Sequence, residues 1–176
     1  MTDLTPHPME DSLPGGVVSI HVAAAHGDPL VSVSEVRAVC GRGLEGDRHY
    51  RHAAGIEMPT GRPSRRGPRS SCDVTLIEIE ALAALEQECG ITLSPGESRR
   101  NILTRGISLY LLVGQQFHVG QVRLHGIKLS RPCAHLERLT QPGVVKGLVH
   151  RAGLRAEIIE SGRIRVGDRI EVQCTD

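Results

Sequence analysis

LVGQQFHVGQVRLHGIKLSRPC, residues 112–133, determines the fold class of this 176-residue chain. Hydrophobic and polar residues alternate from Phe117, and the alternation changes phase after Gly120 and continues to Leu124. This pattern predicts two strands joined by a turn. A second change of phase near Gly126 predicts a β-bulge, which is common at barrel rims and beside functional sites.

The rest of the chain also contains more predicted strands than helices. Apolar or alternating segments predict strands at 17–24 and 30–36, and the segment 156–172 predicts two more. We expect a hairpin turn at 161–162 and a kink at 167–168 in the last strand. These elements favour a mainly β, barrel-like domain with a few helices packed around it.

One segment has a clear helical pattern. Its apolar residues are spaced to share one face of a helix: Ile79, Leu82, Leu85 and Cys89. Thr75 and Glu78 have the spacing of a capping box at its start, and Gly90 is placed to end it. We therefore expect Cys89 to lie in the core.

Composition excludes several classes of protein. The net charge is +1 and only 2% of residues are aromatic, so neither a general field for DNA nor a stacking platform for bases is expected. No apolar run approaches the roughly 20 residues of a membrane span, and the N-terminus lacks a signal pattern. We expect a cytoplasmic protein that binds neither nucleic acid nor membrane.

The chain is expected to form a single domain. Residues 1–16 are acidic and rich in proline and glycine, which predicts a flexible N-terminal arm, and 17–176 form the domain. Residues 51–72 are rich in Arg, Gly, Pro and Ser, which predicts a flexible loop inside it. Its basic part either grips an anion or is simply solvated.

Cys133 is the candidate reactive residue. It follows Arg131 and Pro132 and precedes a short helical run at 134–139. A helix start and a neighbouring arginine both favour the thiolate, which is the form that attacks or binds metal. The alternative is a buried structural cysteine, as most free cysteines are.

Two further segments carry candidate binding groups. The glycine-rich loop 40–50 ends in charged side chains and is either a binding loop or a surface turn. Arg99 and Arg100 precede Asn101, and arginine forks beside an amide suit a phosphate or oxo-anion. Such pairs of arginines are also common on solvated surfaces.

Together these motifs resemble the MOSC domain, which is named for the C-terminal domain of molybdenum cofactor sulfurase. The resemblance covers about residues 15–173. It rests on six motifs in the family's order: GLEGDRHY (43–50), PGESRRNI (95–102), LVGQQFHVGQVRL (112–124), SRPCAHLE (130–137), LVHRAGLRAEIIESG (148–162) and IRVGDRIEV (164–172).

The resemblance implies a β-barrel fold and a cysteine that coordinates molybdenum or carries sulfur, which falls on Cys133. It implies that the family's Arg-x-Asn element, here Arg99 and Asn101, helps to hold the pterin of the molybdenum cofactor. The family's Gly-Asp-Arg-His loop falls on four residues: Gly46, Asp47, Arg48 and His49.

We add four neighbouring residues to the expected cofactor site: Arg100, Arg131, His135 and His150. Arginines and glycine-rich backbone suit the cofactor's phosphate, and the histidines, with His49, are candidates to shuttle protons. A soft thiolate is a suitable ligand for molybdenum. A zinc site through Cys133 and His135 is an alternative, although two neighbouring ligands leave the others unspecified.

Two functions remain open. The first is a molybdenum-dependent oxidoreductase that reduces N-hydroxylated small molecules, with Cys133 as the metal ligand and a separate electron donor. The second is a sulfur carrier that receives a persulfide on Cys133 from a cysteine desulfurase and delivers it to a metal–sulfur cofactor.

The chain also departs from larger members of the family that it resembles. It has no aminotransferase-like domain, so pyridoxal phosphate is not expected, and it lacks the N-terminal β-barrel module that completes the pocket in the amidoxime-reducing members. We expect a partner or a second copy to complete the site, or a domain that only binds and passes on its cargo. The arginine-rich insert at 61–69 is a candidate for part of the missing wall.

Overall fold

A computed structural model of the chain describes residues 15–51 and 73–172. The helices and strands follow one another along the chain as β1 (Gly16–Val22), β2 (Val31–Val33), β3 (Glu35–Val39), β4 (Gly43–Leu44), β5 (Val74–Glu78), α1 (Ile79–Cys89), η1 (Pro95–Ser98), β6 (Ile102–Arg105), η2 (Leu109–Leu112), β7 (Gln116–Val119), β8 (Val122–Leu129), α2 (Ala134–Leu139), α3 (Val144–Gly147), β9 (Leu154–Glu160), β10 (Gly162–Arg165) and β11 (Ile170–Val172). The elements η1 and η2 are 3₁₀ turns. The prediction of a mainly β protein with few helices is confirmed.

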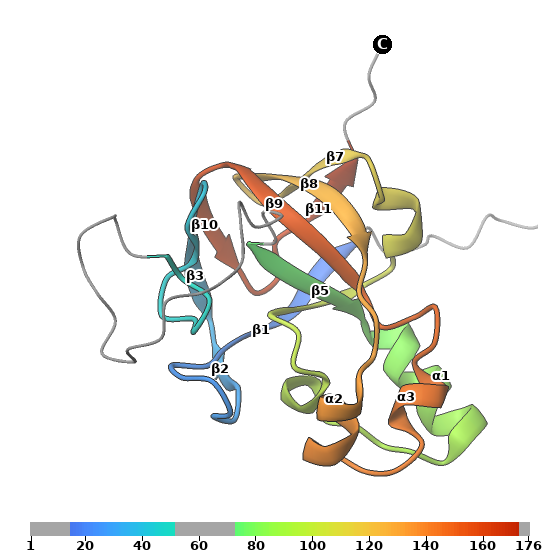
Figure 1. Cartoon of the computed structure of the whole chain (residues 1–176). Helices are drawn as coiled ribbons and strands as arrows, with labels where there is room; N and C mark the ends of the chain where they lie inside the picture. Colours follow the sequence, from blue (N-terminus) through green and yellow to red (C-terminus); the bar gives the residue numbers. More distant parts are fainter. Residues whose placement is uncertain (1–14, 52–72, 173–176) are drawn as a thin grey trace, which may run out of the picture.

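Most strands belong to one sheet. Its eight strands run in the order β11-β7-β8-β9-β5-β6-β1-β2, and β10, β3 and β4 form a second, smaller sheet. The helices α1, α2 and α3 gather at one end of the large sheet (Figure 1). No helix among the described residues is long and apolar enough to cross a membrane.

The large sheet curves so that the chain just before β11 meets β1, but no continuous ladder of strand pairing closes the sheet there. A bridge joins Gly16 to Arg169, and the backbone N–H of Val17 donates to the carbonyl of Asp168 at 2.9 Å. Within residues 15–51 and 73–172, no strand pairing turns this contact into a closed ring. The closed barrel stays a prediction.

The opening motif folds as expected. The strands β7 and β8 form an antiparallel hairpin that turns at Gly120 and Gln121. The register between β8 and β9 shifts between Gly126 and Lys128, which is the predicted bulge. The glycine is needed there because a Cβ at this position would lie 2.0 Å from the carbonyl oxygen of Leu112.

Several local predictions are wrong because tertiary pairing prevails over local pattern. The segment 30–36 divides into β2 and β3, which lie in different sheets. The strand β10 pairs with β3 rather than β9, so no hairpin forms at 161–162. The kink expected at 167–168 is a turn that separates β10 from β11, and these strands also lie in different sheets.

The start and end of α1 also differ from expectation. Thr75 lies within β5 and does not cap α1, whose N-cap residue Glu78 makes no side-chain cap bond. Gly90 ends the helix in the left-handed conformation, as predicted. Cys89 is exposed rather than in the core, because it lies in the last turn at the edge of the α1–α3 contact.

Two apolar clusters stabilise the fold. One fills the space enclosed by the sheets and includes the fully buried Phe117. The other lies between the sheet and the helices, around Leu85, Val144 and Leu148. The second cluster anchors the helical end of the molecule, where the chain returns from β8 through α2 and α3 to β9.

The predicted arm at 1–16 and loop at 51–72 lie largely outside the described residues, and so does the insert at 61–69. Gly15 and Gly16 are the exceptions in the first segment: the carbonyl of Gly15 accepts from the backbone N–H of Ile170 at 2.8 Å, and Gly16 begins β1. At the edge of the second, Arg51 donates to the buried carboxylate of Asp73 at 3.0 Å. Both segments otherwise stay predictions.

Candidate functional site

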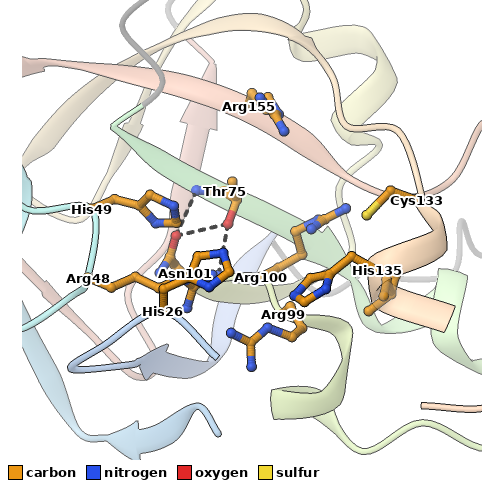
Figure 2. A pocket seen from close by; sticks show the side chains of 11 residues that line it. His26, Arg48, His49, Thr75, Arg99, Arg100, Asn101, Cys133, His135 and Arg155 are labelled. Carbon is orange, nitrogen blue, oxygen red and sulfur yellow. Dashed lines mark hydrogen bonds between the residues drawn. The ribbon is translucent and has the colours of Figure 1, made fainter. Parts of the chain in front are cut away.

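One pocket collects most of the side chains that the sequence motifs suggested (Figure 2). Its cavity has a volume of about 210 Å³. The lining residues come from the β1–β2 connection, the loop after β4, β5, the η1–β6 connection, the end of the β8–α2 connection, α2 and β9: His26, Arg48, His49, Thr75, Arg99, Arg100, Asn101, Cys133, His135, Leu136 and Arg155.

Four predicted site residues do not line this pocket. Asp47 lies behind it, buried, and acts on its walls through hydrogen bonds. Gly46 has a positive φ of 82° in the same loop. Arg131 and His150 are exposed and lie outside the lining.

Four lining residues were not expected: His26, Thr75, Leu136 and Arg155. The spacing of Thr75 from Glu78 predicts a helix cap, but Thr75 lies in β5. Arg155 is an exposed residue in an alternating strand and has no local signature. Only the pairing of Thr75 with Arg155 across β5 and β9 brings the latter to the site.

Asn101 is the structural centre of the pocket. Its Oδ1 accepts hydrogen bonds from the backbone N–H and the hydroxyl of Thr75, at 3.1 and 2.9 Å. Its Nδ2 donates to the carbonyl of His21 at 3.2 Å and to the carboxylate of Asp47 at 3.1 Å. The amide has thus used two donors and two acceptor sites, which is its full capacity. Asn101 therefore positions the walls and has no bond left for a ligand.

Replacement of Asn101 by leucine is expected to destabilise the protein by about 3 kcal/mol, because buried polar partners lose their bonds and each costs about 1–3 kcal/mol. For a chain of this size the melting temperature falls by about 6–12 °C. Thr92→Val is the control, because Thr92 is exposed and its hydroxyl makes one surface hydrogen bond to Glu86. Equal thermal shifts for both variants would show that the network does not hold the fold.

Asp47 holds the loop that carries the pocket residues Arg48 and His49. Its carboxylate accepts from the backbone N–H of His49 at 3.0 Å and of Ala23 at 3.3 Å, and the His49 Nδ1 lies 3.1 Å away. Burial by itself raises the pKa of Asp47. The bonds from His49 and Ala23 and the charge of Arg48 outweigh burial, so the pKa is lowered.

The lowered pKa of Asp47 makes a pH-dependent contribution to stability. Because the folded protein holds the carboxylate charged, this contribution is fully present above the ordinary pKa of aspartate, about 3.9. It is lost as pH falls through the lower folded pKa. The free-energy difference between wild type and Asp47→Asn is therefore expected to be large at pH 7 and to shrink progressively as pH falls below about 3.9.

Denaturant unfolding at several pH values measures this difference. Glu45→Gln is the matched control in the same loop, because among the described residues the Glu45 carboxylate pairs with the exposed Arg37 alone, at the surface. Its effect is expected to be small throughout. A difference for Asp47→Asn that stays constant from pH 7 to pH 3 would contradict the assignment.

The pocket is strongly cationic. Its lining contains four arginines and no carboxylate. Arg99 donates to the carbonyl of Asp28 at 2.6 Å, and Arg100 donates to the carbonyl of Ala152 at 2.9 Å. These backbone acceptors orient the guanidinium groups and carry no net charge themselves.

The electrostatics confirm the crowding of positive charge. Burial, and secondly the charge of Arg48, lower the pKa of Arg99. The Nη1 of Arg48 is buried and has no hydrogen-bond partner among the described residues. A buried donor without a partner is costly, so an anionic ligand at this point would relieve both the charge and the missing bond.

Cys133 lies at the edge of the pocket. It directly precedes α2 with an extended backbone, as its position after Pro132 predicted, and its side chain is exposed rather than buried. Figure 2 shows the sulfur on the pocket side of the chain. The rings of His26 and His135 stack beside it with centroids 5.7 Å apart. In the described part of the chain no three His, Cys, Asp or Glu side chains are grouped to hold a metal, so the predicted zinc pair lacks further ligands.

Several solved structures have a fold similar to that of this chain. YuaD from Bacillus subtilis has a TM-score of 0.74 at 18% identity, over 93% of this chain and 98% of that one. YiiM from Geobacillus stearothermophilus has a TM-score of 0.68 at 15% identity, over 92% and 76%. YiiM from Escherichia coli has a TM-score of 0.62 at 16% identity, over 93% and 70%. These likenesses establish a shared fold.

No curated protein matches the chain. The family model described as the MOSC domain matches residues 49–171, which include the arginine–asparagine motif, the cysteine and the last strands. The chain therefore belongs to the MOSC domain family.

Proposed function

We propose that this MOSC protein binds the molybdenum cofactor in the pocket, with Cys133 as the metal ligand, and reduces N-hydroxylated small molecules. The observation that carries the proposal is the meeting of four arginines and an exposed cysteine over one cavity whose lining contains no carboxylate. Anionic groups and a thiolate-binding metal are the chemical complement of such a set.

The residues present fit this cofactor. Arg48 offers a buried donor without a partner, and Arg99 is held beside it by the Asp28 carbonyl. These two side chains would hold the cofactor's phosphate. The thiolate of Cys133 is soft, as a molybdenum ligand should be.

The size of the cavity supports a site that is shared with another surface. Its volume of about 210 Å³ is below the roughly 300–1,000 Å³ of typical ligand pockets. Cys133, His26 and His135 are exposed at its edge, so a larger ligand would project from it. We infer that a partner protein or a second copy of the chain covers the remainder.

When bound, the cofactor supplies two-electron redox chemistry. The overall reaction breaks the N–O bond of the substrate, takes two electrons from a separate redox protein and two protons, and releases the amine and water. His49 and His135 line the pocket, and imidazoles are suited to move protons near neutral pH. The arginines hold anionic groups in place while this occurs.

A second function, sulfur transfer, is favoured by the exposure of the Cys133 thiol. The thiolate would attack the terminal sulfur of a cysteine desulfurase's persulfide. A new S–S bond forms on Cys133, the old S–S bond breaks, and the desulfurase leaves as its thiolate. No net oxidant is needed.

Elemental analysis tests the two functions against each other. Protein expressed with an intact cofactor pathway is expected to contain about one molybdenum per chain and to reduce a simple amidoxime when given an electron donor. Protein without molybdenum that accepts labelled sulfur on Cys133 would replace the reductase with the sulfur carrier. Protein that does neither would overturn both.

A further inference from the structure

Arg155 lies on a different wall of the pocket from the other arginines. It belongs to β9, and its antiparallel partner in β5 is Thr75. Thr75 in turn bonds to Asn101, which precedes β6. Figure 2 shows Arg155 apart from Arg48 and Arg99, with Thr75 and Asn101 between them.

A second cation, Lys128, lies directly opposite Arg155 on the neighbouring strand β8. The bulge after Gly126 shifts the register of β8, and as a result Lys128 pairs directly with Arg155. Both side chains are exposed, and within the described residues neither side chain makes a hydrogen bond or an ion pair. Like charges directly opposite one another in an antiparallel pair destabilise a sheet.

The nearest carboxylate along the strand does not neutralise this pair. Glu157 is two residues from Arg155 and shares its face of β9, yet the described structure contains no ion pair between them. The charge of Glu157 acts instead on Asp73: burial is the main cause of the raised pKa of Asp73, and the negative charge of Glu157 raises it further. No carboxylate within the described residues is ion-paired with either cation, so an anion bound at Arg155, on its side of the pocket, would also lie near Lys128.

We propose that Arg155 and Lys128 form a second anion-binding subsite, which holds a carboxylate or phosphate group of the substrate. The inference rests on the proposed reductase function and narrows it, because it selects anionic over neutral N-hydroxylated compounds. Arg48 and Arg99 bind the cofactor's phosphate. Arg155 in the lining of the pocket, with Lys128 opposite it on β8 and outside that lining, binds the substrate's anionic group. Cys133 lies at the edge of the same cavity.

Three related substrates test the subsite: benzamidoxime, its 4-carboxylate and its 4-phosphonate. The measured quantity is the ratio of kcat/KM for each anionic compound to that for the neutral one, with rates expressed per bound molybdenum. Arg155→Gln is expected to lower this ratio about tenfold, since a charge-assisted hydrogen bond is lost. Arg155→Lys should restore most of it. The larger ratio in wild type identifies whether carboxylate or phosphate is preferred.

Arg105→Gln is the matched control. Arg105 ends β6, is exposed and lies outside the pocket, so the ratio should stay at the wild-type value. A merely structural role of Arg155 would lower kcat/KM for all three substrates together. A ratio unchanged in Arg155→Gln would therefore overturn the subsite.

A binding measurement separates failure of the subsite from failure of the reductase function. Calorimetric titration of the purified protein with benzoate and with inorganic phosphate needs no turnover. If no amidoxime is reduced but Arg155→Gln weakens benzoate or phosphate binding about tenfold, the subsite stands and the reductase function falls. If neither anion binds more weakly to the variant than to wild type, the subsite is overturned.

Discussion

Replacement of Cys133 by serine is expected to reduce bound molybdenum at least about tenfold, and amidoxime reduction with it. Even partners one shell away from a metal change its affinity by about 10–100-fold, and the serine hydroxyl is a harder, weaker ligand than a thiolate. The substitution removes no buried contact, because the side chain of Cys133 is exposed. The melting temperature should thus shift by no more than about 2 °C.

Cys40→Ser is the matched control for this experiment. Cys40 is also an exposed free cysteine, but it lies outside the pocket, and its backbone N–H donates to the hydroxyl of Ser161. It should retain the wild-type molybdenum content. Equal molybdenum in both variants would remove Cys133 from the metal site and with it the proposed function.

Replacement of Gly153 by alanine is expected to destabilise the protein by about 4 kcal/mol or more, which places it among the largest single-residue effects. The new Cβ would lie 1.9 Å from the carbonyl oxygen of Leu76, and the φ of 94° is itself unfavourable for alanine. Backbone atoms cannot rotate away as a side chain can. The melting temperature should fall by about 8–16 °C, or the variant should not be recovered as soluble folded protein.

The effect reaches the site through one hydrogen bond. The carbonyl of Gly153 accepts from the backbone N–H of Ser130 at 2.7 Å, at the start of the segment that leads to Cys133. Gly27→Ala is the control, since Gly27 has a φ of 95° but no atom within 4 Å of a new Cβ. It isolates the backbone strain, at about 1 kcal/mol. Equal losses of stability in the two variants would show that the backbone at Gly153 and Leu76 can move apart to accept the new Cβ.

Elements whose cause is local were predictable. The β7–β8 hairpin and the bulge beside Gly126 follow from alternation and from glycines within a few residues of each other. The residue Cys133 precedes a helix because Pro132 separates extended from helical chain. These features need no knowledge of distant segments.

Elements whose cause is distant were missed. The sequence around Thr75 fits a capping box. In the folded chain, however, the Thr75 hydroxyl donates to Asn101, and its strand β5 pairs with β6 and β9, so Thr75 does not cap α1. Cys89 continues an apolar stripe, but the core ends before the last turn of α1. The spacing of apolar residues along a helix does not indicate how far a distant element packs against that helix.

Alternation along the chain predicted the mainly β class and a cysteine before a helix, and the resemblance of the motifs predicted the family. Through that resemblance and their neighbouring positions, five residues were expected at one site, and all of them line the same pocket: Arg48, Arg99, Arg100, Asn101 and Cys133. The saturation of Asn101 by internal hydrogen bonds is visible only in the folded chain. Strand pairing alone carries Arg155 to the pocket and sets Lys128 opposite it. The physical reason is that hydrogen-bond partners and strand register are fixed by segments far apart in the chain, whose spacing leaves no trace in either segment alone.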